Sequence, residues 1–175
     1  MADLTDIQQR HIRLMTLTAE TIGHVLKNVS IDQASTLRDG PEGWTILEII
    51  CHLRDFDTIF RQRAQQMLTE DHPQLPAYDH DAMAIDKNYI EEDFAYAYDG
   101  FRFSRSQTKA FFEQLTPEQW AKTGIHPERG AFSMTDAVIQ VGHHDAQHLE
   151  QITLLLEQEL PGSGALPSED LDADD

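Results

Sequence analysis

Four long segments with helical periodicity constrain the fold of this chain most strongly. Apolar residues recur in them at spacings of three and four, which is the pattern of amphipathic helices, and none shows the alternation of a strand. The segments extend over about residues 4–29, 44–68, 86–115 and 133–159. Four amphipathic helices in one domain predict an all-α fold, a four-helix bundle in which sites are built from inward side chains on facing helices.

Local capping signals support the ends of these segments. Thr45 and Glu48 form a capping box at the start of the second segment, and Ser133 can cap the last one. Pro117 stands at a favoured first position of a short helical turn. Gly100 disfavours helix inside the third segment. The stretch "TEDHPQLPAYDHD" between the second and third segments predicts an irregular connection.

The length and composition indicate one folded domain. The 175 residues are enough to bury a continuous core without disulfides or a structural metal. We therefore predict one bundle domain over residues 1–160. Residues 161–175 are acidic and lack aromatic side chains, which predicts a disordered tail.

Charge excludes several classes of partner. The 31 acidic and 13 basic residues give a net charge of −18, so neither nucleic acid nor a membrane surface is an expected partner. The single cysteine, Cys51, excludes an internal disulfide and fits a reducing compartment. The start lacks the pattern of a secretory signal. These features predict a cytoplasmic protein. A small-molecule substrate is expected from the histidine site described below.

The last helical segment places two histidines on its inward face. The stretch "VGHHDAQHLEQI" contains three histidines, but His143 lies about 100° round the helix from His144. The inward stripe, at spacings of three and four, contains Met134, Ala137, Val141, His144, His148, Ile152 and Leu155. His144 and His148 are therefore consecutive members of the core face.

Two inward imidazoles one helical turn apart can chelate one metal ion. The alternative is a pair of neutral core histidines held by hydrogen bonds. A third ligand should come from another helix, and His52 lies at the flank of the apolar stripe of the second segment. Cys51 is a rival ligand, but it is rotated towards the opposite flank. His52 is therefore the better candidate.

Other residues have simpler interpretations. His11 reads as a core residue with satisfied hydrogen bonds or as a neighbour of the site, and Asp145 and Glu150 read as surface charge. Arg102 and Arg105 are interpreted as solvated, although they could bind an anionic group if they faced the mouth of the bundle. The remaining candidates read as packing anchors, helix surface or exposed loop residues: Trp44, Trp120, His24, His72, His80 and His126.

Two motifs carry a resemblance to a known family. The pattern "GWT.LEI..HL.D" extends from Gly43 to Asp55, and "H...H..QI" extends from His144 to Ile152. In these motifs the chain resembles the DinB-like superfamily, whose members are four-helix bundles. The resemblance implies that His52, His144 and His148 bind a divalent metal, zinc or nickel. It further implies that Asp55, or Glu48 as the alternative, accepts the free N–H of an imidazole and so orients it.

The resemblance also implies candidate activities. Relatives include metal-dependent hydrolases and thiol-dependent enzymes, among them a mycothiol-dependent maleylpyruvate isomerase and bacillithiol S-transferases. We therefore expect a hydrolase or a thiol S-transferase, the latter using a low-molecular-weight thiol. The chain lacks the extra C-terminal domain of the isomerase, so that reaction is not expected. Pairing into a homodimer is also implied. The alternative function is a non-catalytic bundle that binds or senses a metal.

Overall fold

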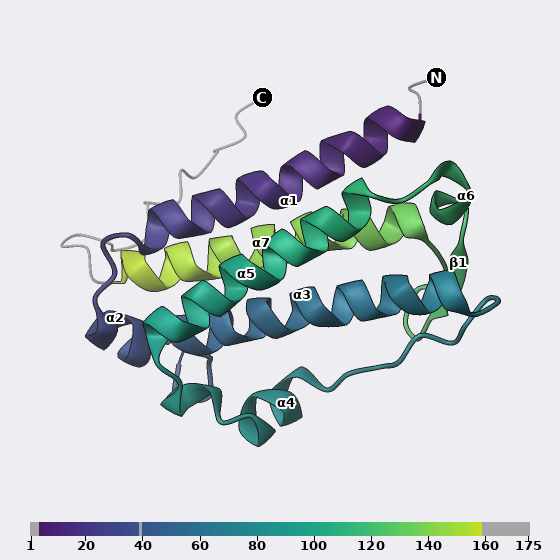
Figure 1. The fold of residues 1–175 in the computed structure, drawn as a ribbon. Coiled ribbons are helices and arrows are strands. Elements are labelled where there is room, and N and C mark those ends of the chain that lie inside the picture. Colours follow the sequence, from purple (N-terminus) through teal and green to yellow (C-terminus); the bar gives the residue numbers. More distant parts are fainter. Residues whose placement is uncertain (1–3, 39, 159–175) are drawn as a thin grey trace, which may run out of the picture.

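Four long helices form the body of the protein. The computed structural model describes residues 4–38 and 40–158, so the predicted tail over residues 161–175 lies outside the described residues. The long helices are α1 (Leu4–Leu26), α3 (Ile46–Thr69), α5 (Phe94–Glu113) and α7 (Met134–Glu157). Helix α3 packs against α5 and α7, and α1 packs against α7 and α5, which closes the bundle (Figure 1). The predicted four-helix bundle is confirmed.

Shorter elements connect the long helices. Helix α2 (Ile31–Thr36) precedes α3, while α4 (His80–Asp86) and the 3-10 turn η1 (Tyr89–Glu91) lie between α3 and α5. The predicted turn at Pro117 is α6 (Pro117–Trp120). A hairpin of β1 (Thr123–His126) and β2 (Gly130–Ser133) follows, with antiparallel register from Thr123 opposite Ser133 to His126 opposite Gly130. The sequence did not predict the hairpin, because strands of four residues are too short to display alternation.

The third predicted helix begins later than expected. Asn88 has a left-handed backbone, with a φ of 52°, which interrupts helical geometry, and the Asp93 side chain then accepts a hydrogen bond from the Tyr96 N–H to cap α5. The helix is continuous through Gly100. A Cβ atom at Gly100 would stand 2.8 Å from the Arg54 Cδ, so glycine permits the close approach of α3 and α5 here.

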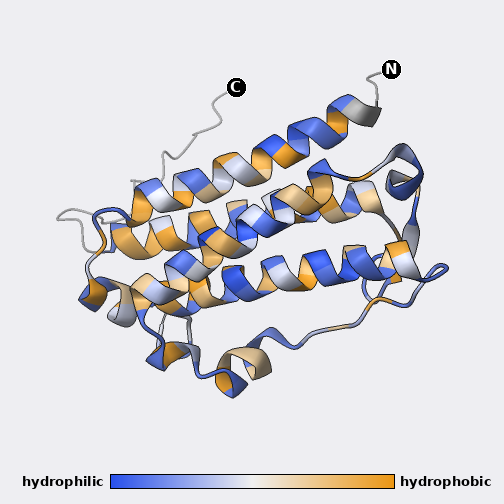
Figure 2. Ribbon diagram, viewed as in Figure 1, coloured by the Kyte–Doolittle hydropathy of each residue, from blue (hydrophilic) through white to orange (hydrophobic). Residues whose placement is uncertain are grey.

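Apolar side chains from the four long helices form the core. The ribbons of these helices alternate between hydrophobic and hydrophilic residues (Figure 2). The capping box predicted at Thr45 and the cap predicted at Ser133, which forms a capping box with Asp136, are both present and stabilise the first turns of α3 and α7. Within the described residues, no helix is long and apolar enough to span a membrane.

Candidate metal centre

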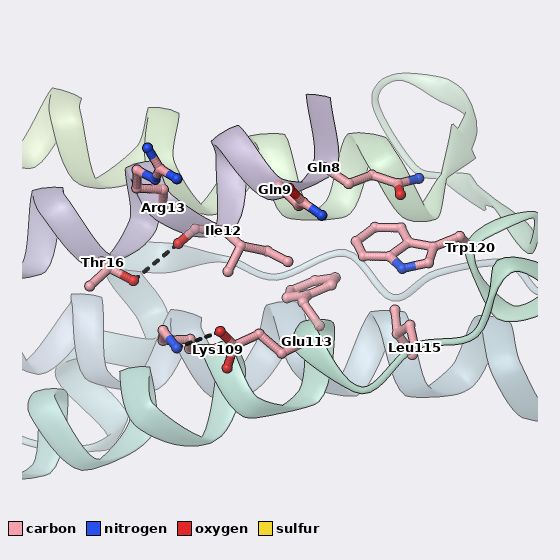
Figure 3. Close-up of a pocket in the computed structure, with 10 residues that line it drawn as sticks. Gln8, Gln9, Ile12, Arg13, Thr16, Lys109, Glu113, Leu115 and Trp120 are labelled. Atoms are coloured by element: carbon pink, nitrogen blue, oxygen red, sulfur yellow. Dashed lines mark hydrogen bonds and ion pairs between the residues drawn. The ribbon is translucent and has the colours of Figure 1, made fainter. Parts of the chain in front are cut away.

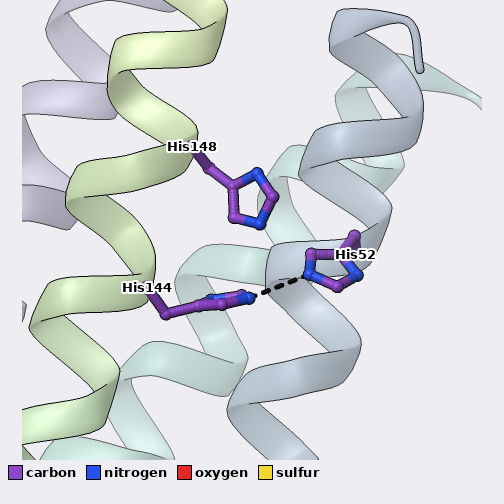
Figure 4. Close-up of side chains that lie close together, drawn as sticks. All are labelled: His52, His144 and His148. Carbon is purple, nitrogen blue, oxygen red and sulfur yellow. Dashed lines mark hydrogen bonds between the residues drawn. The ribbon is translucent and has the colours of Figure 1, made fainter. Parts of the chain in front are cut away.

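Three histidines from two helices converge at one point in the bundle. His52 projects from α3, and His144 and His148 project from successive turns of α7 (Figure 4). The Nε2 atoms of His52 and His144 are 2.9 Å apart, and one nitrogen from each of the three rings lies within 4.8 Å of the others. We call these residues the histidine triad. The neighbouring His143 is exposed on another face of α7.

Aromatic side chains enclose the triad. The Phe56 ring centroid lies 4.2 Å from that of His52, and the Phe60 centroid lies 5.2 Å from that of His144. Trp44, just before α3, packs 4.7 Å from the His52 ring, centroid to centroid. The His52 side chain is consequently buried, with 2% of the residue exposed. These rings hold the imidazoles in place and keep water from their sides.

The triad is electrically neutral without a metal. Burial, together with the charges of His148 and His80, lowers the pKa of His52 to about 2. Burial lowers the pKa of His144 and of His148 as well, because desolvation penalises the protonated imidazole. Neutral rings offer a lone pair each, which is the form that binds metal.

One ring has its orientation set by a hydrogen bond. The Nδ1 of His148 lies 2.9 Å from the Oε1 of Gln151. Because an amide oxygen can only accept, His148 Nδ1 carries the proton and its Nε2 keeps the lone pair. Gln151 belongs to the closing motif "H...H..QI", but no role was predicted for it, although its spacing of three residues from His148 places it on the same side of α7.

The cluster has the composition and size of a metal site. Three imidazole nitrogens within 4.8 Å of one another compare with roughly 3.3 Å between two nitrogens bound to one tetrahedral zinc ion. Small side-chain rotations therefore suffice to bring them to ligand distance. The Nδ1 of His52 is buried and has no hydrogen-bond partner in residues 4–38 and 40–158, so this part of the protein does not satisfy all polar atoms of the ring.

Comparison with known proteins places the chain in a family. The sequence profile of the DinB superfamily matches residues 6–152, a span that includes the whole triad. The chain belongs to the DinB superfamily. Two proteins of Oceanobacillus iheyensis are similar to it, one 26% identical over 156 residues and the other 29% identical over 151 residues. The matches cover 87% of both chains for the first, and 78% of this chain and 80% of the relative for the second. Both relatives are named, provisionally, as metal-dependent hydrolases.

Solved structures show the same DinB fold. YfiT from Bacillus subtilis superposes with a TM-score of 0.77 at 22% identity, covering 86% of each chain, and is described in provisional terms as a metal-dependent hydrolase with an unusual four-helix bundle topology. The mycothiol-dependent maleylpyruvate isomerase superposes with a TM-score of 0.71 at 12% identity over 87% of this chain and 63% of its own length. At sequence identities this low, the structural similarity shows a shared fold and nothing further.

The carboxylates expected to orient the DinB histidines point elsewhere. Asp55 accepts hydrogen bonds from Arg54, Lys87 and Tyr89 at 2.7–2.8 Å. Although burial raises the pKa of Asp55, these hydrogen bonds lower it below the usual range. Glu48 accepts from the backbone N–H of Thr45 at 2.8 Å in the capping box. Both carboxylates are thus occupied in holding the ends of elements around the site.

Asp145 is a buried member of an ion network, and its interpretation as surface charge was wrong. It is 1% exposed and lies 2.5 Å from the Nη1 of Arg105, which is 5% exposed, so Arg105 is not solvated either. Arg105 also contacts Asp57 at 3.0 Å and donates to the Met15 carbonyl oxygen at 2.6 Å. Thr18 donates to Asp145. The network therefore links all four long helices, beside the turn of α7 that carries His144.

A fourth imidazole lies beside the triad. His80, the first residue of α4, stacks on Phe56 with 4.6 Å between ring centroids, and its ring is 5.4 Å from that of His52. The sequence placed His80 in a loop without a role, because nothing local signals that this connection folds back along α3.

Cys51, the rival ligand considered from the sequence, is fully buried, and burial raises the pKa of its thiol to about 12. A thiol so reluctant to ionise is a poor metal ligand.

Acid is expected to destabilise the metal-free protein. The lowered pKa values of His52, His144 and His148 mean that the unfolded chain binds protons below pH 6.5 that the folded chain does not. The contribution of these three histidines to the free energy of unfolding is present above about pH 6.5. It is lost as the pH falls towards their pKa values in the folded protein. For His52, protonation of the unfolded chain lowers the free energy of unfolding at pH 5.5 by about 1.4 kcal/mol.

One group opposes this trend. Burial raises the pKa of Asp57 to about 6, so its contribution is present at low pH and is lost as the pH rises through 6. One carboxyl group offsets only part of the effect of three imidazoles. Urea denaturation with EDTA present should therefore give a lower free energy of unfolding at pH 5.5 than at pH 7.5. Equal values at the two pH values would contradict the neutral triad.

Proposed function

We propose that this protein is a metal-dependent hydrolase that acts on a small molecule, with His52, His144 and His148 as the metal ligands. The observation that carries the proposal is the convergence of three neutral imidazoles from α3 and α7 within 4.8 Å. The provisional names of the two Oceanobacillus relatives, which match most of this chain, support hydrolysis as the reaction.

The chemistry of this donor set suits hydrolysis. A divalent ion on three neutral ligands would supply Lewis acidity, which polarises a carbonyl group and acidifies a water molecule. The contribution of the chain is to hold the ligands. Gln151 fixes the tautomer of His148, and the rings of Phe56, Phe60 and Trp44 hold the imidazoles and exclude water around them. Three imidazoles suit zinc and nickel alike, so both remain predicted ions.

Two other functions follow from the same donor set. A thiol S-transferase would use the ion to stabilise a thiolate of a low-molecular-weight thiol. A non-catalytic bundle would bind the ion for stability or sensing. Hydrolysis is favoured over both because the two curated relatives carry that name, whereas the likeness to the mycothiol-dependent enzyme concerns the fold.

The test is a metal and activity measurement on protein purified without a histidine tag. We expect about one zinc or nickel ion per chain by mass spectrometry. Hydrolysis of a panel of small activated esters and amides should disappear on chelation and return when zinc or nickel is added. Protein that neither carries nor rebinds a metal would overturn the proposal. Turnover that requires an added thiol would identify a transferase in place of a hydrolase.

A further inference from the structure

A cavity of about 360 Å³ opens beside the triad. It is lined by Arg129, Ile139, Gln140, His143, His144 and Gln147. Because His144 belongs to the triad, a molecule in this cavity would lie in contact with one of the candidate metal ligands. The volume is at the small end of the range for ligand pockets, which suits a compact metabolite.

The lining of this cavity carries positive charge in a strongly acidic protein. The six residues include one arginine and no carboxylate, whereas the whole chain has a net charge of −18. Arg129 is exposed at the turn of the β-hairpin, and within residues 4–38 and 40–158 it makes no ion pair. Its guanidinium fork is thus available to a carboxylate from outside the chain.

A second arginine strengthens the positive field at this end of the bundle. Arg63 is 6% exposed, and its Nε has no hydrogen-bond partner among the described residues. Its other nitrogens donate to the Pro76 carbonyl oxygen and to His126, and it forms no ion pair with a carboxylate in the described part of the chain. Burial lowers the pKa of Arg63, and the charge of Arg129 adds to this shift, whereas Tyr78 and the exposed Glu128 oppose it.

Three arginines on α3 and α5 are already paired with carboxylates of the chain. Arg105 contacts two buried carboxylates, and Arg54 pairs with Asp55 and Glu92. Arg102 pairs with Asp99 and lies over the Tyr98 ring. The anion-binding role that the sequence suggested for Arg102 or Arg105 is therefore better met by Arg129.

A larger cavity does not offer the same chemistry. It has a volume of about 670 Å³ and lies between α1 and α5, with the side chains of Arg13, Lys109 and Trp120 around it (Figure 3). Lys109 is paired with Glu113 in its wall, and its lining includes no member of the triad. A substrate of the metal site would not be bound there.

We propose that the cavity beside His144 binds a carboxylate group of the substrate through Arg129. This inference rests on the proposed metal-dependent function and specifies its substrate class: a small carboxylate-bearing molecule whose reacting group reaches the triad. Gln140 and Gln147, one turn before and after His144, line the same cavity and can hydrogen-bond the remaining polar groups of the ligand.

The experiment measures binding of simple carboxylates to the zinc-loaded protein by calorimetry. Acetate can occupy the metal or the arginine, whereas malonate, succinate and glutarate can reach both. We expect at least one dicarboxylate to bind about tenfold or more tightly than acetate, and Arg129→Gln to remove this gain. Arg102→Gln is the matched control, an exposed arginine on α5 whose loss should change neither affinity.

The outcomes separate the two proposals. Wild-type protein that does not take up zinc would overturn the proposed function itself. Zinc-loaded protein that binds acetate and the dicarboxylates equally, or an Arg129→Gln variant that keeps the gain, would overturn the carboxylate site and leave the metal site standing. Zinc content should be the same in the wild type and in Arg129→Gln.

Discussion

Replacing Arg105 by methionine is expected to lower the free energy of unfolding by about 3–5 kcal/mol. The side chain is buried and contacts Asp57 and Asp145, which are themselves buried. Its removal leaves both carboxylates in the core without a counter-ion. A buried charge without a counter-ion destabilises the folded state. The measurement is the midpoint of urea denaturation at pH 7.5 with EDTA present, so that metal binding does not contribute.

Two further variants show whether the ion network is the cause. Arg102→Met, on the exposed side of the same helix, should change stability by no more than about 0.5 kcal/mol. Combining Arg105→Met with Asp57→Leu and Asp145→Leu should recover much of the loss, because no buried charge is then left unpaired. Equal effects of Arg105→Met and Arg102→Met would contradict a buried network.

Replacing His144 by alanine is expected to abolish both metal binding and hydrolysis. Changes that only disturb the orientation of a ligand cost about 10–100-fold in metal affinity, so the loss of a ligand should exceed about 100-fold. The alanine also leaves two imidazoles, His52 and His148, which form an incomplete donor set. Competition with a chromophoric chelator measures the affinity, and the ester panel measures the activity.

The preceding residue, His143, provides the matched control for metal binding. His143→Ala removes an exposed imidazole that is not part of the triad and should leave metal content and metal affinity unchanged. Circular dichroism should show the same helix content in both variants. A His144→Ala protein that retained full metal affinity would exclude this residue as a ligand.

Helical periodicity was enough to predict which histidines would meet. On α7, His144 and His148 lie on the stripe with buried Val141 and Ile152, and a stripe of this kind faces the core in a bundle. His52 on α3 was the better third candidate by its place at the flank of the apolar stripe, and the resemblance to the DinB-like superfamily, confirmed by the family match, pointed to the same residue. These inferences needed only local spacing and a motif.

The ion network could not be predicted in the same way. Asp145 follows Val141 by four residues and precedes Ile152 by seven, so a signal for its burial was present in the stripe. Asp145 can be buried because Arg105 on α5, 40 residues away, pairs with it. No local sequence pattern connects these two residues. Pairing between helices depends on how they pack, and a single sequence does not reveal it. The same limit applies to Arg129, which the hairpin brings to α7.

The separation of the triad along the chain has a consequence for how the protein acquires its site. His52 and His144 are 92 residues apart, and α7 carries two of the three ligands. A ribosome-bound chain that has emerged only as far as α5 presents one imidazole of the triad, His52, and lacks the two ligands on α7. Helix α7 must also pack against α1. Contacts between these two helices join the parts of the bundle that are farthest apart in the sequence. A metal bound as proposed would therefore be acquired only after α7 has been synthesised and has docked against the other helices.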